Sequence, residues 1–265
     1  MFADHPLTGL TVPGSVQDLA RGRAIRPVWH NSAGGLAFLI GDGPDEFVKW
    51  APAGSPLNLP AEADRLAWAS RYVTVPRPLR AGTDEAGSWL VTTVLPGRSA
   101  VQEPWSSDPR TAVTAIGAGL RALHETLPVA GCPFDWTAET RLADARRRAA
   151  AGLIDPAGWH EDHQSLTLAG ALAELASIPA TGRLVVCHGD SCAPNTMLSD
   201  DGRWSAHVDL SDLGVADRWA DLAIATWSAT WNYGPGWEQL LLDAYGIEAD
   251  PERTRYYRLL WSLGP

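Results

Sequence analysis

The arrangement of apolar and polar positions changes near Gly97. Before this residue, short apolar runs alternate with clusters of Gly, Pro and Ser, which is typical of β-strands joined by turns. After it, apolar residues recur every three or four positions over longer stretches, which predicts amphipathic helices. The pattern therefore predicts an α+β chain with a β-rich first part and a mostly helical second part.

The same pattern places the individual elements. In the first part, strands are expected at 26–30, 36–40, 46–50 and 88–94, helices at 14–20 and 58–72, and a turn at 81–84. In the second part, helices are expected at 109–127, 137–151, 162–180, 217–233, 237–245 and 251–260, and strands at 184–187, 196–198 and 204–208. Because Leu-Pro-Gly ends the strand at 88–94, we expect a lobe of residues 1–94, a hinge at 95–98 and a second lobe of residues 99–265.

A polar loop after the apolar run 184–187 holds the strongest candidate chemistry. Asp190 and Asn195 lie in this loop, and Asp209 ends the return strand of the hairpin that follows. Because a hairpin brings its two ends together, we expect the three side chains to converge. Two carboxylates and a carboxamide suit Mg²⁺, and a carboxylate outside the metal shell can orient a hydroxyl and accept its proton. These are the parts that phosphoryl transfer needs.

The first part of the chain supplies candidate phosphate contacts. Lys49 lies among apolar neighbours in a predicted strand, where an unpaired charge is costly, and Glu62 begins the next helix, so the two are expected to pair. A surface lysine and a helix-start glutamate are the alternative interpretation. The Gly/Ser turn around Ser32 would let backbone N–H groups approach a phosphate, although such turns often only join strands.

Charge and cysteine content narrow the function classes. The formal net charge is −10 over 265 residues and no Lys/Arg-rich block occurs, which argues against a nucleic-acid partner. An acidic protein can attract cationic small molecules, or its acidity serves only solubility. Three cysteines without metal-ligand spacing predict free thiols in a reducing compartment. With no targeting signal and no apolar run long enough to span a membrane, a cytoplasmic protein without membrane partners is expected.

Several longer motifs include or follow these residues. They are Val186-Cys187-His188-Gly189-Asp190, Pro194-Asn195, Val208-Asp209-Leu210, Leu213-Gly214-Val215-Ala216-Asp217-Arg218 and Asp221-Leu222-Ala223, and the tail Tyr257-Arg258-Leu259-Leu260. Together they resemble the aminoglycoside phosphotransferase family, especially its 3'- and streptomycin-type 3''-members, and the resemblance extends from about Ser32 to Leu260. It implies a two-lobed protein-kinase-like fold with a small β-rich N-lobe and a larger helical C-lobe.

Matched position by position, the resemblance also implies site residues and cofactors. It gives a catalytic aspartate, Asp190; two magnesium ligands, Asn195 and Asp209; and three residues at the nucleotide phosphates, Ser32, Lys49 and Glu62. It further implies that Asp217 braces the catalytic loop. The implied reaction moves the γ-phosphoryl group of ATP or GTP to a hydroxyl of an aminoglycoside-like antibiotic, which would confer resistance.

The departures from the family pattern concern the acceptor. Ser211-Asp212 replaces Gly-Arg, Trp227 and Trp231 replace an Arg and a Glu, and the chain ends Trp261-Ser262-Leu263-Gly264-Pro265 where relatives end in acids that hold ammonium groups. Trp227 and Trp231 share a helix face and would stack on sugar rings or cations, with core packing as the alternative. Glu161 or Asp162 would then supply an ammonium contact.

These departures leave two other functions open. The protein could phosphorylate a less cationic metabolite or a peptide antibiotic. It could also be a catalytically weak nucleotide-binding sensor in which Asp212 disturbs the metal site.

Overall fold

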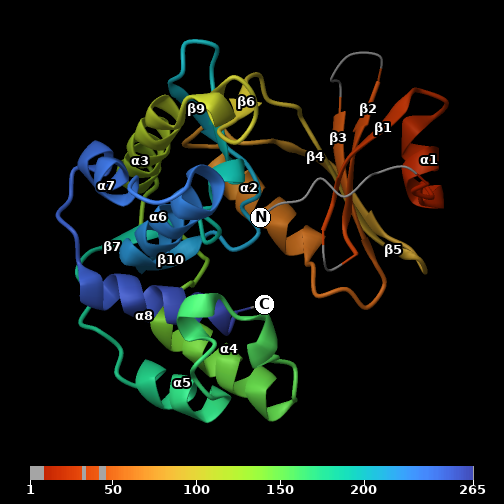
Figure 1. The fold of residues 1–265 in the computed structure, drawn as a ribbon. Helices are drawn as coiled ribbons and strands as arrows, with labels where there is room; N and C mark the ends of the chain where they lie inside the picture. The colour runs from red at the N-terminus through yellow and green to blue at the C-terminus, as the bar shows by residue number, and fades with distance from the viewer. Residues whose placement is uncertain (1–8, 32–33, 42–45, 265) are drawn as a thin grey trace. The chain divides into compact units, whose positions relative to one another are not determined.

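The computed structural model describes residues 9–31, 34–41 and 46–264. The chain forms two compact units (Figure 1). Unit 1 consists of Met1–Pro96 and Val208–Ser211, and unit 2 consists of Gly97–His207 and Asp212–Pro265. The short segment Val208–Ser211 therefore belongs by its packing to the first unit, although it is far from that unit in sequence.

An antiparallel five-stranded sheet forms the body of unit 1. Its order is β1–β2–β3–β5–β4, with bounds Ile25–His30, Leu36–Ile40, Glu46–Pro52, Gly87–Thr92 and Pro78–Thr83. Strand β4 lies where a turn was predicted at 81–84, so that prediction is wrong. Gly82 pairs with Trp89 of β5, and a Cβ at residue 82 would come within 2.8 Å of the indole ring. The glycine makes room for a ring and does not mark a turn.

Two helices cover the two faces of this sheet (Figure 1). Val16 and Ala20 of α1 (Gly14–Ala20) pack with Phe38, Val48 and Val91 in one apolar cluster. Helix α2 (Leu59–Ala69) contacts β3, β4 and β5. Because successive side chains of a strand point to opposite faces, Lys49 faces away from the cluster that contains Val48.

Unit 2 is mostly helical. Its helices are α3 (Pro109–Thr126), α4 (Ala138–Ala150), α5 (Leu168–Leu175), α6 (Trp219–Tyr233), α7 (Glu238–Tyr245) and α8 (Pro251–Ser262). Short 3-10 turns lie at η1 (Trp105–Ser107), η2 (Pro156–Gly158), η3 (Glu161–His163) and η4 (Ala193–Asn195). Its strands are β6 (Arg98–Ser99), β7 (Leu184–Cys187), β8 (Thr196–Leu198), β9 (Trp204–His207) and β10 (Gly214–Asp217). The predicted α+β class, with strands first and helices after, is confirmed.

Two predicted helices of unit 2 were placed wrongly. The helix expected at 162–180 is the turn η3 followed by α5, because Thr167 starts a new helix by accepting the amide hydrogen of Gly170 at 3.1 Å. The helix expected from 217 begins two residues later. Residues 214–217 instead form β10, which pairs antiparallel with β7, and the Asp217 side chain then accepts the amide hydrogen of Trp219 at 2.9 Å.

The core of unit 2 is built around α3, α6 and α8. Ile116 and Leu120 of α3, Leu222 of α6 and Leu260 of α8 are each exposed by 1% or less and belong to one cluster. Helix α8 contacts α6, α4 and α5. Helix α6 is buried along most of its length, which makes it a rigid support for side chains that it presents to neighbouring loops.

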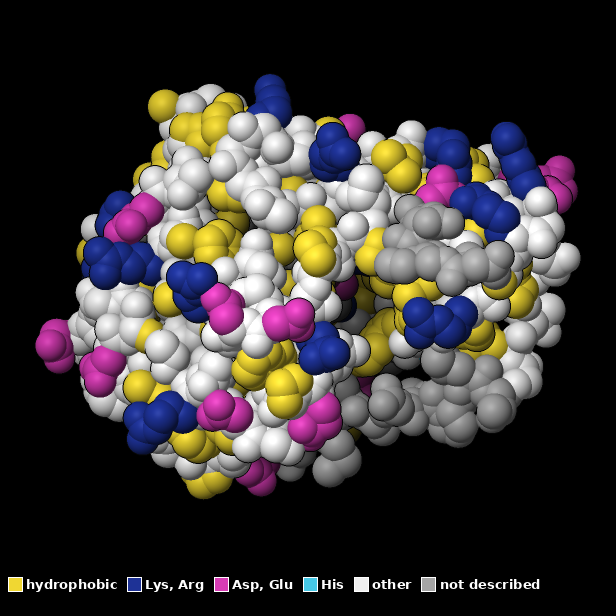
Figure 2. Space-filling model, turned by 90° about the horizontal axis from the view of Figure 1, so that it is seen from above, with side chains coloured by type: hydrophobic (Ala, Val, Ile, Leu, Met, Phe, Trp, Pro, Cys, Tyr) yellow, Lys and Arg dark blue, Asp and Glu magenta, His cyan; other side chains and the backbone are white. Residues whose placement is uncertain are grey.

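Two observations concern the charged surface and the apolar character of the helices. On the face shown in Figure 2, the described Lys/Arg and Asp/Glu side chains are interspersed and gather in no block of one sign. Within the described ranges, no helix is long and apolar enough to cross a membrane.

Candidate active site

The loop of residues 188–195 follows β7, whose Val185, Val186 and Cys187 are buried. Gly189 adopts φ +89°, a conformation that L side chains rarely adopt. A Cβ at this position would come within 2.5 Å of the carbonyl carbon of Asp212. Two independent constraints, backbone conformation and space, therefore require glycine immediately before Asp190.

Asp221, in the first turn of α6, holds the start of loop 188–195. Its Oδ2 accepts the amide hydrogen of His188 at 2.6 Å, and its Oδ1 accepts that of Gly189 at 3.0 Å. The side chain is completely buried. Burial alone would raise its pKa, but the bond from His124 and the neighbouring donors outweigh burial and hold the pKa of Asp221 below its usual value.

The bracing role that the resemblance assigned to Asp217 therefore belongs to Asp221. Asp217 instead accepts amide hydrogens from Gly182 and Trp219, at the junction of β10 and α6. Both aspartates lie beside the start of α6, and sequence alone did not separate their roles. A signal for Asp221 was present, because a carboxylate among apolar helix residues must find donors when it is buried.

Asp190 and Asn195 lie together at the other end of the loop. The Asn195 Nδ2 atom donates to the Asp190 Oδ2 at 2.9 Å and to the Asp190 backbone oxygen at 3.0 Å. Both residues are partly exposed. The carboxamide nitrogen of Asn195 is thus directed at Asp190. The carboxamide oxygen of Asn195, the atom that a hard cation prefers, therefore points away from Asp190.

Two further bonds fix loop 188–195 within unit 2. The Ala193 amide donates to the Ser228 Oγ of α6 at 2.9 Å, and the Ser99 Oγ donates to the Pro194 backbone oxygen at 2.8 Å. Together with Asp221, Ser228 ties the loop to α6 at two points along the helix. The loop that carries Asp190 is therefore held by backbone contacts as well as by its own side chains.

The Lys49 ammonium of β3 lies between two carboxylates in unit 1. Its Nζ is 2.7 Å from Glu62 Oε1 of α2 and 2.8 Å from Asp209 Oδ1. Burial would lower the pKa of Lys49, but the two carboxylates outweigh it and raise the pKa above its usual value. The predicted Lys49–Glu62 pair is confirmed, and Glu62 itself is only 3% exposed.

Asp209 adopts φ +63°, one of two non-glycine residues with positive φ in the described chain. This left-handed conformation is uncommon outside glycine and marks a locally constrained residue. In the hairpin before it, Thr196 of β8 pairs with His207 of β9. Asn195 directly precedes Thr196, and Asp209 follows His207 by two residues, so both predicted metal ligands are next to this strand pair in sequence.

Ser32 lies outside the described residues. Beside it, the Asn31 Oδ1 atom accepts the amide hydrogen of Gly35 at 2.7 Å, and Gly34 has φ +80°. The described residues on the two sides of positions 32 and 33 are therefore held together where β1 ends and β2 begins.

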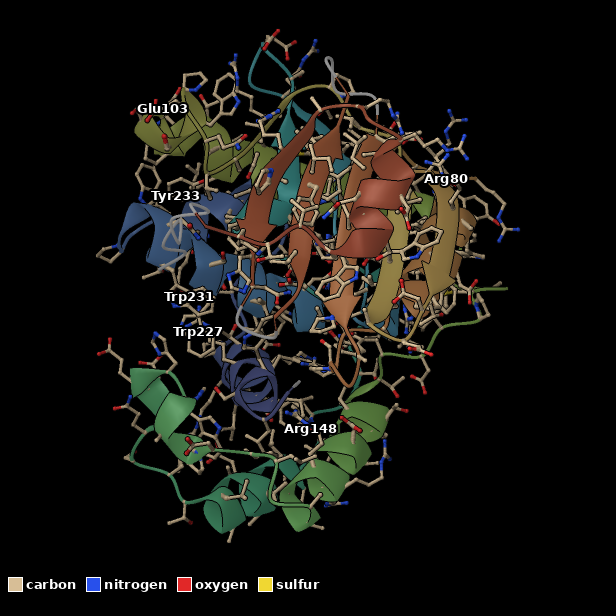
Figure 3. All side chains as sticks on the ribbon, turned by 90° about the vertical axis from the view of Figure 1, so that its right-hand side faces the viewer. Arg80, Glu103, Arg148, Trp227, Trp231 and Tyr233 are labelled. Atoms are coloured by element: carbon tan, nitrogen blue, oxygen red, sulfur yellow. The ribbon has the colours of Figure 1, made fainter. Side chains whose placement is uncertain are left out.

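The two tryptophans form an aromatic cluster with residues that sequence reasoning missed. Trp227 and Trp231 lie one turn apart on α6, with ring centroids 5.0 Å apart (Figure 3). The His160 ring is 4.4 Å from that of Trp227 and 5.9 Å from that of Trp231. Trp227 is 3% exposed and packs on Cys192 of loop 188–195, whereas Trp231 is partly exposed. Core packing therefore describes Trp227, and Trp231 and His160 form the accessible part of the cluster.

Acidic side chains flank this cluster. Glu161 and Asp162 lie in the exposed turn η3, directly after His160. An Asp162 carboxylate oxygen is 3.4 Å from the His160 Nδ1. The structure thus brings Asp162 beside the aromatic rings, within the same unit that holds Asp190.

Asp212 has a basic neighbour. The buried guanidinium of Arg141 on α4 stacks on the Trp136 ring at 4.7 Å. Burial lowers the pKa of Arg141, and the Asp212 carboxylate is the strongest of the acidic groups that oppose this change. The acid at residue 212 is therefore offset by a buried cation of unit 2.

Comparisons with known proteins agree with this arrangement. The model of the phosphotransferase enzyme family matches residues 25–257. An aminoglycoside 3'-phosphotransferase of Streptomyces fradiae is 38% identical over 88% of this chain and 93% of its own. The streptomycin 3''-kinase of Streptomyces griseus is 35% identical over 97% of each chain.

Solved structures are similar over nearly the whole chain. The crystal structure of an aminoglycoside 3'-phosphotransferase of type VIII aligns with a TM-score of 0.80 and 31% identity, over 94% of this chain and 97% of that one. An aminoglycoside phosphotransferase from Streptomyces rimosus, in complex with ADP and streptomycin, aligns with a TM-score of 0.76 and 30% identity, over 95% and 99%. The expected kinase-like α+β fold is confirmed.

Proposed function

Because the chain belongs to the phosphotransferase enzyme family, we propose that it transfers the γ-phosphoryl group of ATP to a hydroxyl of an aminoglycoside-like antibiotic. The reaction would inactivate the antibiotic and so confer resistance. One observation carries the proposal: a carboxylate, Asp190, is held by a carboxamide, Asn195, in a loop whose backbone is fixed by a buried acid. In that arrangement Asp190 is the base, and Asn195 and Asp221 keep it in place.

Asp190 would act on the acceptor. Its carboxylate accepts a hydrogen bond from the acceptor hydroxyl and orients the oxygen toward the γ-phosphorus. The new O–P bond forms as the bond between the γ-phosphorus and the bridging oxygen breaks, and ADP leaves with that electron pair. The proton of the hydroxyl passes to Asp190. Because the transition state is loose, positioning matters more than base strength.

Asn195 and Asp209 fit a magnesium ion by their chemistry. Both offer oxygen atoms, and the Asn195 nitrogen is already engaged with Asp190. A magnesium ion held there would neutralise charge on the β- and γ-phosphate oxygens. Asp209 also contacts Lys49, so the proposed metal ligand and the proposed phosphate contact are direct neighbours.

Lys49 would bind the upstream phosphates, with Glu62 fixing its direction. Two carboxylates keep the ammonium charged, and an anionic phosphate can take the place of one of them. Ser32, which the resemblance assigns to the nucleotide phosphates, would contribute to the same binding. We propose ATP as the donor, with GTP as the alternative that a nucleotide competition assay decides.

The aromatic cluster would bind the acceptor. Trp231 would stack on a sugar ring, Trp227 would support it from the core, and Glu161 and Asp162 would pair with ammonium groups. A partly exposed tryptophan in this place, Trp231, favours acceptors with fewer ammonium groups than a purely acidic site would. A less cationic metabolite is therefore the second candidate acceptor. We propose a cytoplasmic location, where ATP and a reducing environment for the three free cysteines are available.

The proposal is tested by incubating the protein with Mg²⁺, ATP and a panel of acceptors that runs from strongly cationic aminoglycosides to neutral sugars. Mass spectrometry should find a phosphate-sized gain on an aminoglycoside. A gain only on neutral acceptors would support the second candidate. ATP binding without any phosphorylated acceptor would overturn the proposal in favour of a nucleotide sensor.

A further inference from the structure

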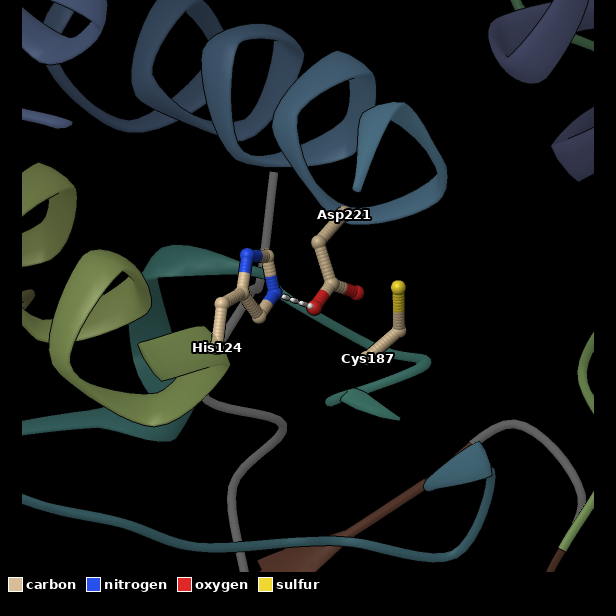
Figure 4. A group of neighbouring side chains, drawn as sticks. All are labelled: His124, Cys187 and Asp221. Carbon is tan, nitrogen blue, oxygen red and sulfur yellow. Dashed lines mark hydrogen bonds and ion pairs between the residues drawn. The ribbon is translucent and has the colours of Figure 1, made fainter. Parts of the chain in front are cut away.

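Three buried polar side chains lie together (Figure 4), and one of them, that of Asp221, bonds the start of loop 188–195. His124 of α3, Cys187 of β7 and Asp221 of α6 each bring one potential ligand atom within 4.8 Å of the others. His124 and Asp221 are buried, and their Nε2 and Oδ2 atoms are 2.9 Å apart. None of these residues contacts an acceptor or nucleotide in the function proposed above.

The hydrogen bonds of this cluster argue against a metal site. Both oxygens of Asp221 already accept backbone amide hydrogens from loop 188–195. The Cys187 thiol donates to the Asp217 backbone oxygen at 3.4 Å, and burial raises its pKa well above the usual value. An ion would have to break these bonds and remove the thiol proton. The cluster is therefore a hydrogen-bonded unit.

The bonds also fix the tautomer of His124. A carboxylate only accepts, so the Nε2 atom must carry the proton that it shares with Asp221. The Nδ1 atom is 2.9 Å from the Tyr245 hydroxyl, and in the neutral ring it accepts from that hydroxyl. Burial raises the pKa of Tyr245 to about 12, so the hydroxyl keeps its proton at neutral pH. Every polar atom of the His124 ring has a partner of the correct type.

We propose that His124 is a positioning residue for Asp190. It would hold the Asp221 carboxylate in the orientation in which both oxygens receive the amides of His188 and Gly189, and Tyr245 would hold His124. Without the His124 donor, the carboxylate can rotate about its last bond and lose one amide. Gly189 directly precedes Asp190, so this rotation shifts the base. The inference rests on the proposed function only in naming Asp190 as the base.

Two substitutions of His124 separate its two nitrogens. In His124→Gln, the terminal amide reaches the place of Nε2 and can still donate to Asp221. In His124→Asn, the shorter side chain reaches only the place of Nδ1. We expect His124→Gln to keep kcat within about 3-fold, and His124→Asn to lose roughly 10- to 100-fold, because small displacements of a reacting group cost about this much. KM for ATP should change by less than about 3-fold in both.

Tyr245→Phe provides a second, milder variant should His124→Asn fail to fold. It leaves the Nδ1 atom of His124 without its donor and is expected to lower kcat by about 3- to 10-fold. Tyr256→Phe is the matched control, because Tyr256 is also buried and its hydroxyl donates to a backbone oxygen, that of Leu175, away from loop 188–195. This control should retain wild-type kcat.

Hydrogen exchange of the peptide that carries His188 and Gly189, measured on the protein without ligands, completes the test. His124→Asn and Tyr245→Phe should speed exchange there, whereas His124→Gln and Tyr256→Phe should not. Equal exchange in Tyr245→Phe and Tyr256→Phe, or equal kcat losses for His124→Gln and His124→Asn, would overturn the proposal. Hydrogen exchange needs no substrate. If the wild-type protein had no kinase activity, the proposed function would be refuted, and the exchange data alone would decide whether His124 positions loop 188–195.

Discussion

Replacing Gly189 with alanine is expected to weaken both the fold and the reaction. At φ +89° an L residue costs about 1–2 kcal/mol relative to glycine. The new Cβ would lie 2.5 Å from the Asp212 carbonyl carbon, so the backbone must move. That movement weakens the bond from the Gly189 amide to the Asp221 carboxylate, and a bond to a charged group contributes roughly 1.5–3 kcal/mol. The free energy of unfolding should therefore fall by about 2.5–5 kcal/mol.

Gly131→Ala is the matched control for this change. Gly131 has φ +87°, and nothing lies within 4 Å of the place where its Cβ would be. It should lose only the conformational part, about 1–2 kcal/mol, and keep its activity. Urea unfolding and kcat measured on both variants give the comparison. If Gly189→Ala were no more destabilising than Gly131→Ala, the contact with Asp212 and the bond to Asp221 would not matter as argued.

Three further outcomes are expected. Glu62→Gln removes one of the two carboxylates that contact Lys49. It should lower the free energy of unfolding by roughly 1–3 kcal/mol and raise KM for ATP but not for the acceptor. An unchanged KM for ATP would contradict the role of Lys49. Burial lowers the pKa of His163 in the folded protein. As the pH falls below about 6.5, the unfolded chain therefore takes up a proton at this residue before the folded protein does. The free energy of unfolding then declines by at most about 1.4 kcal/mol per pH unit. In His163→Gln, urea titrations should show a flatter decline, and an identical slope would refute this assignment. Trp231→Leu should raise acceptor KM by about 5- to 50-fold at constant KM for ATP, whereas an effect on ATP alone would remove Trp231 from the acceptor site.

The sequence predicted what depends on local pattern and on the cost of burying charge. Lys49 among apolar neighbours was expected to pair with Glu62 rather than to lie at the surface, and the structure confirms this pair and adds Asp209 as a second partner. Periodicity predicted the helices that became α3, α7 and α8. Turn chemistry placed the hairpin of β8 and β9.

Contacts between distant parts of the chain explain what the sequence did not predict. Gly82 suggested a turn, but its role depends on the indole ring of Trp89 on the neighbouring strand. The brace of loop 188–195 joins Asp221 to His124, 97 residues earlier, and neither residue carries a local sign of the other. His160 was missed because its ring partners, Trp227 and Trp231, lie on α6. In each case the deciding partner lies on another element.

The most direct test of the account is the transfer of phosphate itself. The protein and its Asp190→Asn variant would be incubated with Mg²⁺, ATP and aminoglycosides, and the acceptors analysed by mass spectrometry. The account predicts a phosphate-sized mass gain with the wild-type protein. It also predicts that kcat of Asp190→Asn falls by roughly 10²- to 10⁴-fold while ATP binding is retained. Full activity of Asp190→Asn, or no phosphorylated acceptor with the wild-type protein, would contradict the account.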